Sequence, residues 1–116
     1  MKWGRIRQDD GTELTGVISE GMFHPRTGLG EEATAGEPIA FEAADLIAPV
    51  KPGKFIGLWN NFQAAAEKNG WTPPEHPLYF FKADTSLAGH GAEVVIPEGA
   101  GRVLFEGELG IVIGKS

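Results

Sequence analysis

The sequence contains no cysteine among its 116 residues. This absence excludes a disulfide framework, a zinc site built on thiolates and a cysteine nucleophile. Basic residues are also few, since 10 Lys and Arg stand against 16 Asp and Glu and give a formal net charge of −6. A protein that neutralises phosphates needs a basic face, so we expect no nucleic-acid partner.

Long apolar runs are missing as well. No stretch approaches the about 20 apolar residues that span a bilayer, and the first residues, MKWGRIRQDDG, lack the apolar core of a signal peptide. We therefore expect no membrane contact and a cytoplasmic location. The 17 Gly and 8 Pro predict frequent turns and no long helix. The length fits one domain or part of one.

Most of the chain has the pattern of short strands. The Asp10-Gly11 pair predicts a hairpin turn in the first of these regions. A loop over 24–41 leads to a short strand at 39–41, and the apolar stretch 46–50 ends at prolines. The predicted strands lie within 3–25 and at 39–41, 55–58, 78–82, 94–96 and 103–113.

One short helix is expected over 62–69, FQAAAEKN, because this segment holds strong helix formers. Asn60 or Asn61 is the expected N-cap, and Gly70 is the expected C′ glycine. Gln63 and Glu67 are four residues apart and so lie on one face of the helix. Glu67 would act as a base or orient a water, or else the two form an ordinary solvent-facing pair.

The segment VLFEGELGIVIGK, residues 103–115, places two glutamates in an apolar run. Side chains alternate along a strand with a rise of about 3.3 Å per residue, so Glu106 and Glu108 project from one side about 6–7 Å apart. Phe105, Leu109, Ile111 and Ile113 are expected to pack inward on the other side. Hard divalent cations such as Mg²⁺ or Mn²⁺ fit two carboxylates at this spacing. The alternative is an edge strand whose solvated glutamates discourage further pairing.

Lys82 closes the aromatic strand LYFFK before a glycine-rich loop. A lysine there can meet an anionic group, and Gly89 and Gly91 permit close backbone approach. The alternative is a solvated strand terminus. His90 is the one histidine near this region, and it also fits an ordinary loop residue; the three histidines show no metal-ligand spacing to one another.

Four blocks occur in a fixed order: KFIGLWNNFQAAAEKNG, PLYFFKADTSLAGHG, VVIP and FEGELGIVIGK. Their order and gaps resemble the fumarylacetoacetate hydrolase family, in its bacterial aromatic-catabolism branch, over residues 54–115. The resemblance implies a mainly β (α+β) fold, a mixed β-roll with one short lid-like helix that is incomplete in this chain. Residues 1–50 would form a small N-terminal β segment, and residues 51–116 the first part of the catalytic domain.

The family is metal-dependent and usually dimeric. Its members hydrolyse C–C bonds of 2-oxo or 1,3-dicarbonyl acids, or decarboxylate or isomerise oxo-diacids. The resemblance therefore implies an oxo-acid substrate, and either a homodimer or completion of the fold by another chain. The alternative from a different class is a truncated, non-catalytic remnant that binds a partner chain.

The resemblance also assigns roles to residues. Glu106 and Glu108 match the metal pair for Mg²⁺ or Mn²⁺, and a third carboxylate and a further lysine would lie outside these 116 residues. Glu67 matches a catalytic glutamate, but Gln63 or Ala64 stands where the family has a histidine, so Glu67 would act alone or through a water held by a catalytic Gln63. Neither amide nor methyl serves as a general base, which favours decarboxylation or isomerisation over hydrolysis. The substrate contacts carried over are Phe81, Lys82 and His90, with Lys82 also catalytic.

Overall fold

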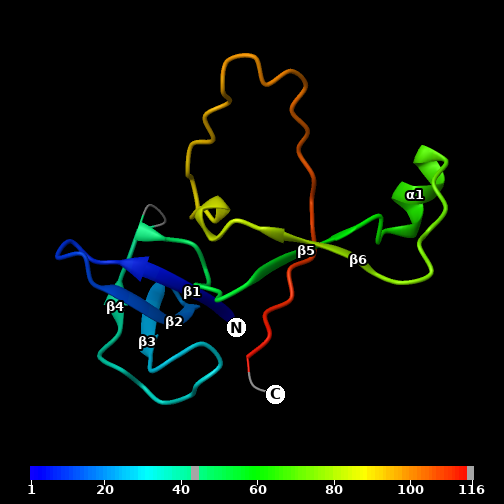
Figure 1. The fold of residues 1–116 in the computed structure, drawn as a ribbon. Coiled ribbons are helices and arrows are strands. Elements are labelled where there is room, and N and C mark those ends of the chain that lie inside the picture. Colours follow the sequence, from blue (N-terminus) through cyan, green and yellow to red (C-terminus); the bar gives the residue numbers. More distant parts are fainter. Residues whose placement is uncertain (43–44, 115–116) are drawn as a thin grey trace. The chain divides into compact units, whose positions relative to one another are not determined.

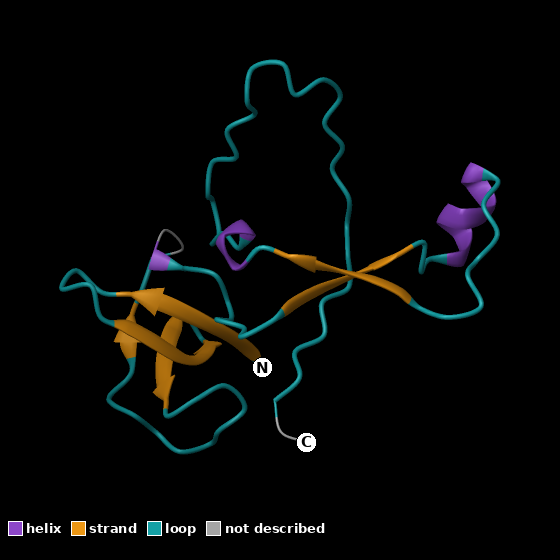
Figure 2. Ribbon diagram, in the orientation of Figure 1, coloured by secondary structure: helices purple, strands orange, loops and turns teal. Residues whose placement is uncertain are grey.

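The computed structural model describes residues 1–42 and 45–114. The chain divides into two compact units, one formed by residues 1–49 with the segment from Gly89 onwards, the other by Val50–Ala88. Figures 1 and 2 show the strands and helices of both. The strands are β1 (Lys2–Arg7), β2 (Glu13–Ser19), β3 (Met22–Arg26), β4 (Ile39–Ala40), β5 (Phe55–Trp59) and β6 (Leu78–Lys82).

The first unit holds a four-stranded antiparallel sheet in the order β1-β2-β3-β4. The predicted hairpin turn at Asp10-Gly11 is confirmed, with Gly11 at φ 85° and the Thr12 N–H donating to Asp10 Oδ1 at 2.8 Å. A second tight turn joins β2 to β3 through Glu20 and Gly21, both with positive φ (52° and 76°), as a type I′ hairpin turn requires. The apolar stretch after residue 45 joins the sheet through a bridge between Ile6 and Leu46.

The core of this sheet is small, and the strand register places Ile6 and Phe23 on one face and Val17 on the other. Phe23 is fully buried, and Ile6 and Val17 are nearly so. The Phe23 ring packs edge-on against Phe41, with centroids 6.2 Å apart. At Gly16 a Cβ would lie 2.7 Å from Phe23 Cζ, so the ring occupies the space that a side chain would need. Glycine is therefore required in the middle of β2 for packing.

The second unit is an antiparallel ribbon of β5 and β6 with helix α1 (Gln63–Asn69) in the connection between them. The short 3₁₀ helix η2 (Asp84–Ser86) follows β6. Phe55 pairs with Lys82 and Trp59 with Leu78, which fixes the register along the whole ribbon. The predicted fold class, mainly β with one short α-helix in the described part of the chain, is confirmed. The assignment of residues 51–116 to a catalytic domain stays a prediction.

The strands predicted at 94–96 and 103–113 do not form within the described residues. After η2 the chain runs on to residue 114 without a helix or strand, as Figure 2 shows. The side chains expected to pack inward are instead exposed: Phe105 by 97%, Leu109 by 79%, Ile111 by 78% and Ile113 by 83%. A strand exists only through hydrogen bonds to a neighbouring strand, and no described strand of this chain supplies them. Lys115, the last residue of the quoted segment, lies outside the described residues.

One further boundary differs from expectation. Strand β3 continues through Pro25 to Arg26, where the sequence predicted a loop from residue 24. Its extension is held by β2, since Thr15 pairs with Arg26 and Gly16 with Pro25. None of the helices in the described part of the chain has the length and apolar character needed to cross a bilayer.

Candidate functional site

Helix α1 begins differently from the prediction. The N-cap is Phe62, at φ −98° and ψ 114°, and no side chain caps the first turn. The expectation of Asn60 or Asn61 is wrong, because the Asn60 amide is used elsewhere: its Nδ2 donates to the carbonyl of Thr72 at 3.1 Å. Asn60 also adopts φ 52°, a left-handed conformation that asparagine tolerates better than most residues.

The end of α1 agrees with the prediction. Gly70 has φ 68° and ψ 25°, the left-handed conformation of a C′ glycine. Its N–H donates to the Glu67 carbonyl at 3.1 Å, and the N–H of Trp71 donates to the Ala66 carbonyl at 2.9 Å. These are the two bonds of a Schellman motif, so the glycine ends the helix as expected.

The two chain segments on either side of α1 are joined at its base. The rings of Trp59 and Trp71 lie 5.4 Å apart between centroids, at a tilt of 31°. The hydrogen bond from Asn60 to Thr72 lies next to this pair along the chain. The helix is therefore presented on a closed loop that leaves β5 and returns to β6.

Gln63 and Glu67 meet on this helix, as their spacing predicts. Gln63 Nε2 donates to Glu67 Oε1 at 2.8 Å, and both side chains are exposed. The amide supplies a hydrogen bond to the carboxylate but has no titratable proton. The catalytic roles of both residues stay predictions.

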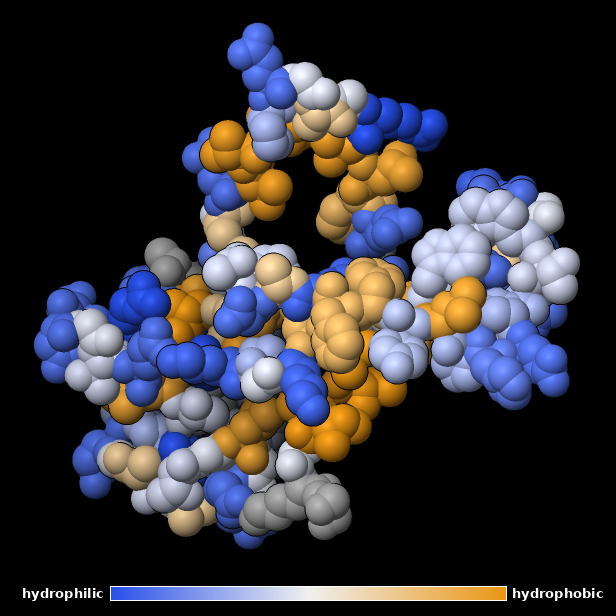
Figure 3. Space-filling model, in the orientation of Figure 1, coloured by the Kyte–Doolittle hydropathy of each residue, from blue (hydrophilic) through white to orange (hydrophobic). Residues whose placement is uncertain are grey.

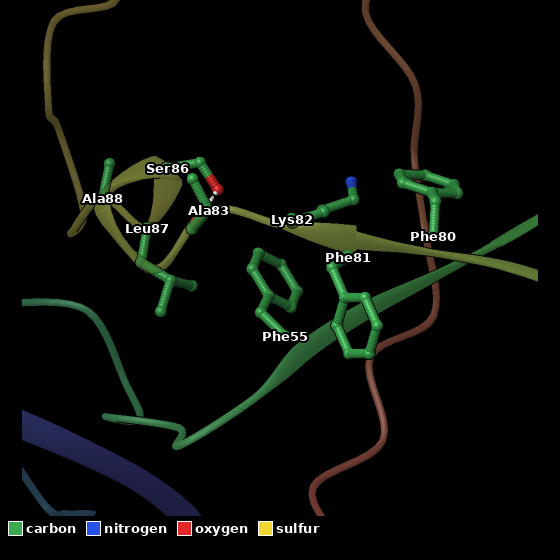
Figure 4. Close-up of a pocket in the computed structure, with 8 residues that line it drawn as sticks. All are labelled: Phe55, Phe80, Phe81, Lys82, Ala83, Ser86, Leu87 and Ala88. Atoms are coloured by element: carbon green, nitrogen blue, oxygen red, sulfur yellow. Dashed lines mark hydrogen bonds between the residues drawn. The ribbon is translucent and has the colours of Figure 1, made fainter.

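Lys82 lies beside a shallow, mainly apolar hollow in the second unit (Figure 4). The Lys82 ammonium lies 5.5 Å from the centroid of Phe55 and 5.7 Å from that of Phe80, within range of cation–π attraction. The register of the two strands explains why both rings lie near the ammonium. Phe55 pairs with Lys82 across the ribbon, and Phe80 lies two residues before Lys82 on the same face of β6. The lining residues are Phe55, Phe80, Phe81, Lys82, Ala83, Ser86, Leu87 and Ala88.

The two other proposed substrate contacts, Phe81 and His90, differ in whether they line the hollow. Phe81 borders the hollow, although it projects to the opposite side of β6 from Lys82 (Figure 4). His90 is not among the lining residues. The glycine before it serves packing instead: a Cβ on Gly89 would lie 2.7 Å from the Leu46 carbonyl oxygen. The substrate-binding roles of Phe81, Lys82 and His90 stay predictions.

Glu106 and Glu108 are exposed on the extended segment after η2. In residues 1–42 and 45–114 no group of three or more His, Asp or Glu side chains is arranged to hold a metal ion. The pair fits Mg²⁺ or Mn²⁺ in chemical type, because both cations prefer carboxylate oxygens. Two carboxylates supply only part of the coordination that either cation takes, so the pair is a partial donor set.

The aromatic residues around Lys82 were not predicted as part of the site. Phe55 and Phe80 line the hollow and flank the ammonium. The available signal was the alternation in the two strands, FIGLW and LYFFK, which places every second residue on one face. To use this alternation, one must know how β5 and β6 are paired. The two strands are separated along the chain by the 18 residues 60–77.

Comparison with known proteins identifies the family. Residues 54–116 match the family described as fumarylacetoacetate (FAA) hydrolase C-terminal. The chain belongs to the fumarylacetoacetate hydrolase family. The predicted resemblance is thus confirmed at the level of the family.

Relatives from two genera match along the whole chain. A protein of Mycobacterium tuberculosis is 30% identical over 100% of this chain and 47% of its own length. The 2,4-didehydro-3-deoxy-L-rhamnonate hydrolase of a Sphingomonas species is 32% identical over 100% of this chain and 45% of its own length. A solved structure from Mycobacterium abscessus has a TM-score of 0.64 at 29% identity, covering 85% of this chain and 40% of that one. The chain thus spans less than half of the length of these relatives.

Proposed function

We propose that this chain forms part of a metal-dependent enzyme that acts on a 2-oxo or 1,3-dicarbonyl acid. The observation that carries the proposal is Lys82, a cation held between two aromatic rings at the rim of an apolar hollow. Such a place suits an organic acid, because the ammonium attracts the carboxylate while the rings contact the carbon skeleton. Family membership and the hydrolase name of the Sphingomonas relative support an enzyme of this kind.

Each proposed residue has a distinct role. Lys82 binds and orients the substrate carboxylate. Glu67 accepts a proton through its carboxylate, and Gln63 orients that carboxylate by its hydrogen bond to Oε1. Glu106 and Glu108 would provide two of the oxygen ligands for Mg²⁺ or Mn²⁺. When bound, such a cation acts as a Lewis acid on the oxo group of the substrate.

The helix favours some reactions over others. Hydrolysis needs a group that removes a proton from water, and because neither the amide of Gln63 nor the methyl of Ala64 does this, Glu67 would have to activate the water alone or through a water held by Gln63. Isomerisation or decarboxylation of an oxo-diacid needs no activated water and places less demand on proton transfer. We therefore favour these two reactions for this chain, with Glu67 moving the proton.

Metal binding and turnover test the proposal separately. Mn²⁺ titrated into the ¹⁵N-labelled chain should broaden the amide signals of residues 105–109 selectively, since a paramagnetic ion relaxes nearby nuclei. Glu106→Gln should weaken the broadening at least tenfold, and Glu98→Gln, in the preceding turn, should leave it unchanged. Oxaloacetate or acetylpyruvate would then be assayed with Mg²⁺ or Mn²⁺. Uniform broadening along the chain, with no turnover of either acid, would contradict the proposal.

A non-catalytic role is the second candidate. The observation that favours it is the exposed apolar segment after η2, which suits association with another polypeptide. In this case the chain would bind a partner without converting an oxo acid. Turnover by the chain, alone or with a partner bound, would exclude this second candidate.

A further inference from the structure

The last residue of helix α1, Asn69, is followed directly by Gly70. Of the three asparagines in the sequence, only Asn69 precedes a glycine. The backbone nitrogen that follows an asparagine can attack its side-chain amide, and a glycine leaves this nitrogen unhindered because it has no Cβ. Both residues are exposed, and a Cβ built on Gly70 would meet no atom within 4 Å. Sequence and exposure together leave this pair open to chemical modification.

Two hydrogen bonds oppose such an attack while the helix is closed. Asn69 Nδ2 donates to the Ala65 carbonyl at 2.8 Å, so the side-chain amide is turned back along the helix. The Gly70 N–H donates to the Glu67 carbonyl at 3.1 Å, which directs the attacking nitrogen into the helix end. Both bonds must break before this nitrogen reaches Asn69 Cγ. The last turn of α1 therefore has to open first.

Helix α1 has few features that keep its last turn closed. It spans seven residues, and isolated helices shorter than about 12 residues are marginal in water. No side chain caps its first turn, and within the described residues 63–69 only Ala66 is buried. In Figure 3 the surface around the helix that Figure 1 labels α1 is drawn mainly in blue and white, as expected for a hydrophilic region. A short helix of this kind opens locally while the rest of the chain stays folded.

We propose that Asn69 is a site of spontaneous deamidation whose rate is controlled by opening of the last turn of α1. The Gly70 nitrogen bonds to Asn69 Cγ, the bond from Cγ to Nδ2 breaks, and ammonia leaves with the proton of the Gly70 N–H. Water then opens the resulting succinimide ring at one of its two carbonyl groups. The product is aspartate, or isoaspartate, in which the backbone continues through the side-chain carbon. Water is the one co-reactant, and no electron is transferred.

The other pair that could close such a ring, Asp10-Gly11, should stay intact. Ring closure there expels water from the carboxyl group, which has to be protonated first. The Thr12 N–H donates to Asp10 Oδ1 at 2.8 Å and so favours the ionised carboxylate. The reaction is therefore expected at Asn69 and not at Asp10.

Either product weakens the end of the helix. Aspartate lacks the Nδ2 donor to Ala65 and places a negative charge beside the C-terminal carbonyls, where the helix dipole disfavours it. Isoaspartate adds a backbone carbon before Gly70, so the two bonds of the Schellman motif cannot both keep their spacing. One of these bonds comes from Trp71, whose ring contacts Trp59. Deamidation thus loosens the loop that carries α1.

Mass spectrometry of the 116-residue chain, held at mildly alkaline pH, tests this inference. Trypsin cleaves after Lys68 and so separates Asn69 from Asn60 and Asn61. The peptide that begins at Asn69 should gain the mass difference between an amide and a carboxyl group, and the other peptide should keep its mass. The folded chain should react about tenfold more slowly than the chain in urea. The test is independent of the proposed reaction, because it measures a change of mass and not turnover.

Three variants show whether the helix controls the rate. Ala65→Gly keeps the carbonyl that accepts from Asn69 but weakens the helix, and should speed the reaction about threefold. Phe62→Ser supplies a side-chain N-cap and should slow it about threefold. Ala100→Gly, outside the helix, should leave the rate unchanged.

Two results would overturn the inference. The first is an unchanged mass at Asn69 in the folded chain, over a time in which the chain in urea is converted. The second is a rate that ignores the helix, either because the folded chain reacts as fast as the chain in urea or because the Ala65 and Phe62 variants react alike.

Discussion

Gln63 Nε2 donates a hydrogen bond of 2.8 Å to Glu67 Oε1 across one turn of helix α1. The carboxylate therefore has a neighbour that donates a hydrogen bond but does not titrate near neutral pH. An imidazole at the same position would do both. The identity of residue 63 thus decides whether this pair can relay a proton, while the helix itself is unchanged.

Replacing Gln63 by histidine should create a coupled acid–base pair. We expect the introduced imidazole to have a pKa above its ordinary value, because the neighbouring Glu67 carboxylate favours the protonated form. The pKa would be measured by NMR titration of the ring protons. In the double variant with Glu67→Gln the pKa should return toward the ordinary value. If both variants titrate alike, the side chains at positions 63 and 67 do not interact in solution.

Lys82 should determine the binding of small oxo acids. Lys82→Met keeps most of the side-chain length but removes the charge, so we expect acetylpyruvate to bind at least tenfold more weakly. Binding would be measured by chemical-shift changes in the amides of β6. Lys51→Met, which removes a charge from the same unit away from the hollow, is the control. Equal weakening in both variants would show that only net charge matters.

Local signals allowed the helix and its end to be predicted from the sequence. FQAAAEKN has high helix propensity, and a left-handed C′ position selects glycine at residue 70 through its own backbone conformation. The N-cap was mispredicted because the Asn60 side chain bonds to Thr72, twelve residues further along. Contacts at that distance are set by the β5–β6 ribbon and not by neighbouring residues.

A strand predicted from the sequence formed only where a neighbouring strand was present to pair with it. Residues 78–82 have an apolar and aromatic pattern and pair with β5, whereas residues 103–113 have the clearer alternation and pair with no described strand. Alternation shows which face would be buried, but the hydrogen bonds come from the neighbouring strand. For the same reason the spacing of Gln63 and Glu67 predicted their contact, while the approach of Phe55 to Lys82 needed the ribbon register.

The turn at Asp10 should make part of the stability depend on acidity. The pKa of Asp10 is lowered from its ordinary value, chiefly by the backbone N–H of Thr12 and then by the Thr12 side chain, which both favour the carboxylate. Because the folded pKa lies below the unfolded one, this stability is present above the unfolded pKa of about 3.9 and is lost as the pH falls through the folded pKa.

Asp10→Asn tests this dependence, because the amide oxygen still accepts from Thr12 but does not titrate. Stability would be measured by urea unfolding at several values between about pH 5 and about pH 2. The variant should lose less stability on acidification than the original chain. Asp9→Asn removes one carboxylate from the same turn and controls for net charge. Identical acid dependence in the two variants would contradict a role for the Thr12 hydrogen bond.

Gly16 should be the least replaceable glycine of the four-stranded sheet. A Cβ there would meet the carbonyl oxygen of His24, and would lie 2.7 Å from Cζ of the fully buried Phe23. Gly16→Ala must displace backbone or the core ring, and overpacking of this kind costs about 1–3 kcal/mol or more. Gly28→Ala, in the loop of the same unit, places its Cβ at an ordinary 3.4 Å from a side-chain carbon of Glu31 and should change the stability by less than about 0.5 kcal/mol. Urea unfolding followed by circular dichroism would compare them, and equal stabilities would show that the sheet core relaxes around a methyl group.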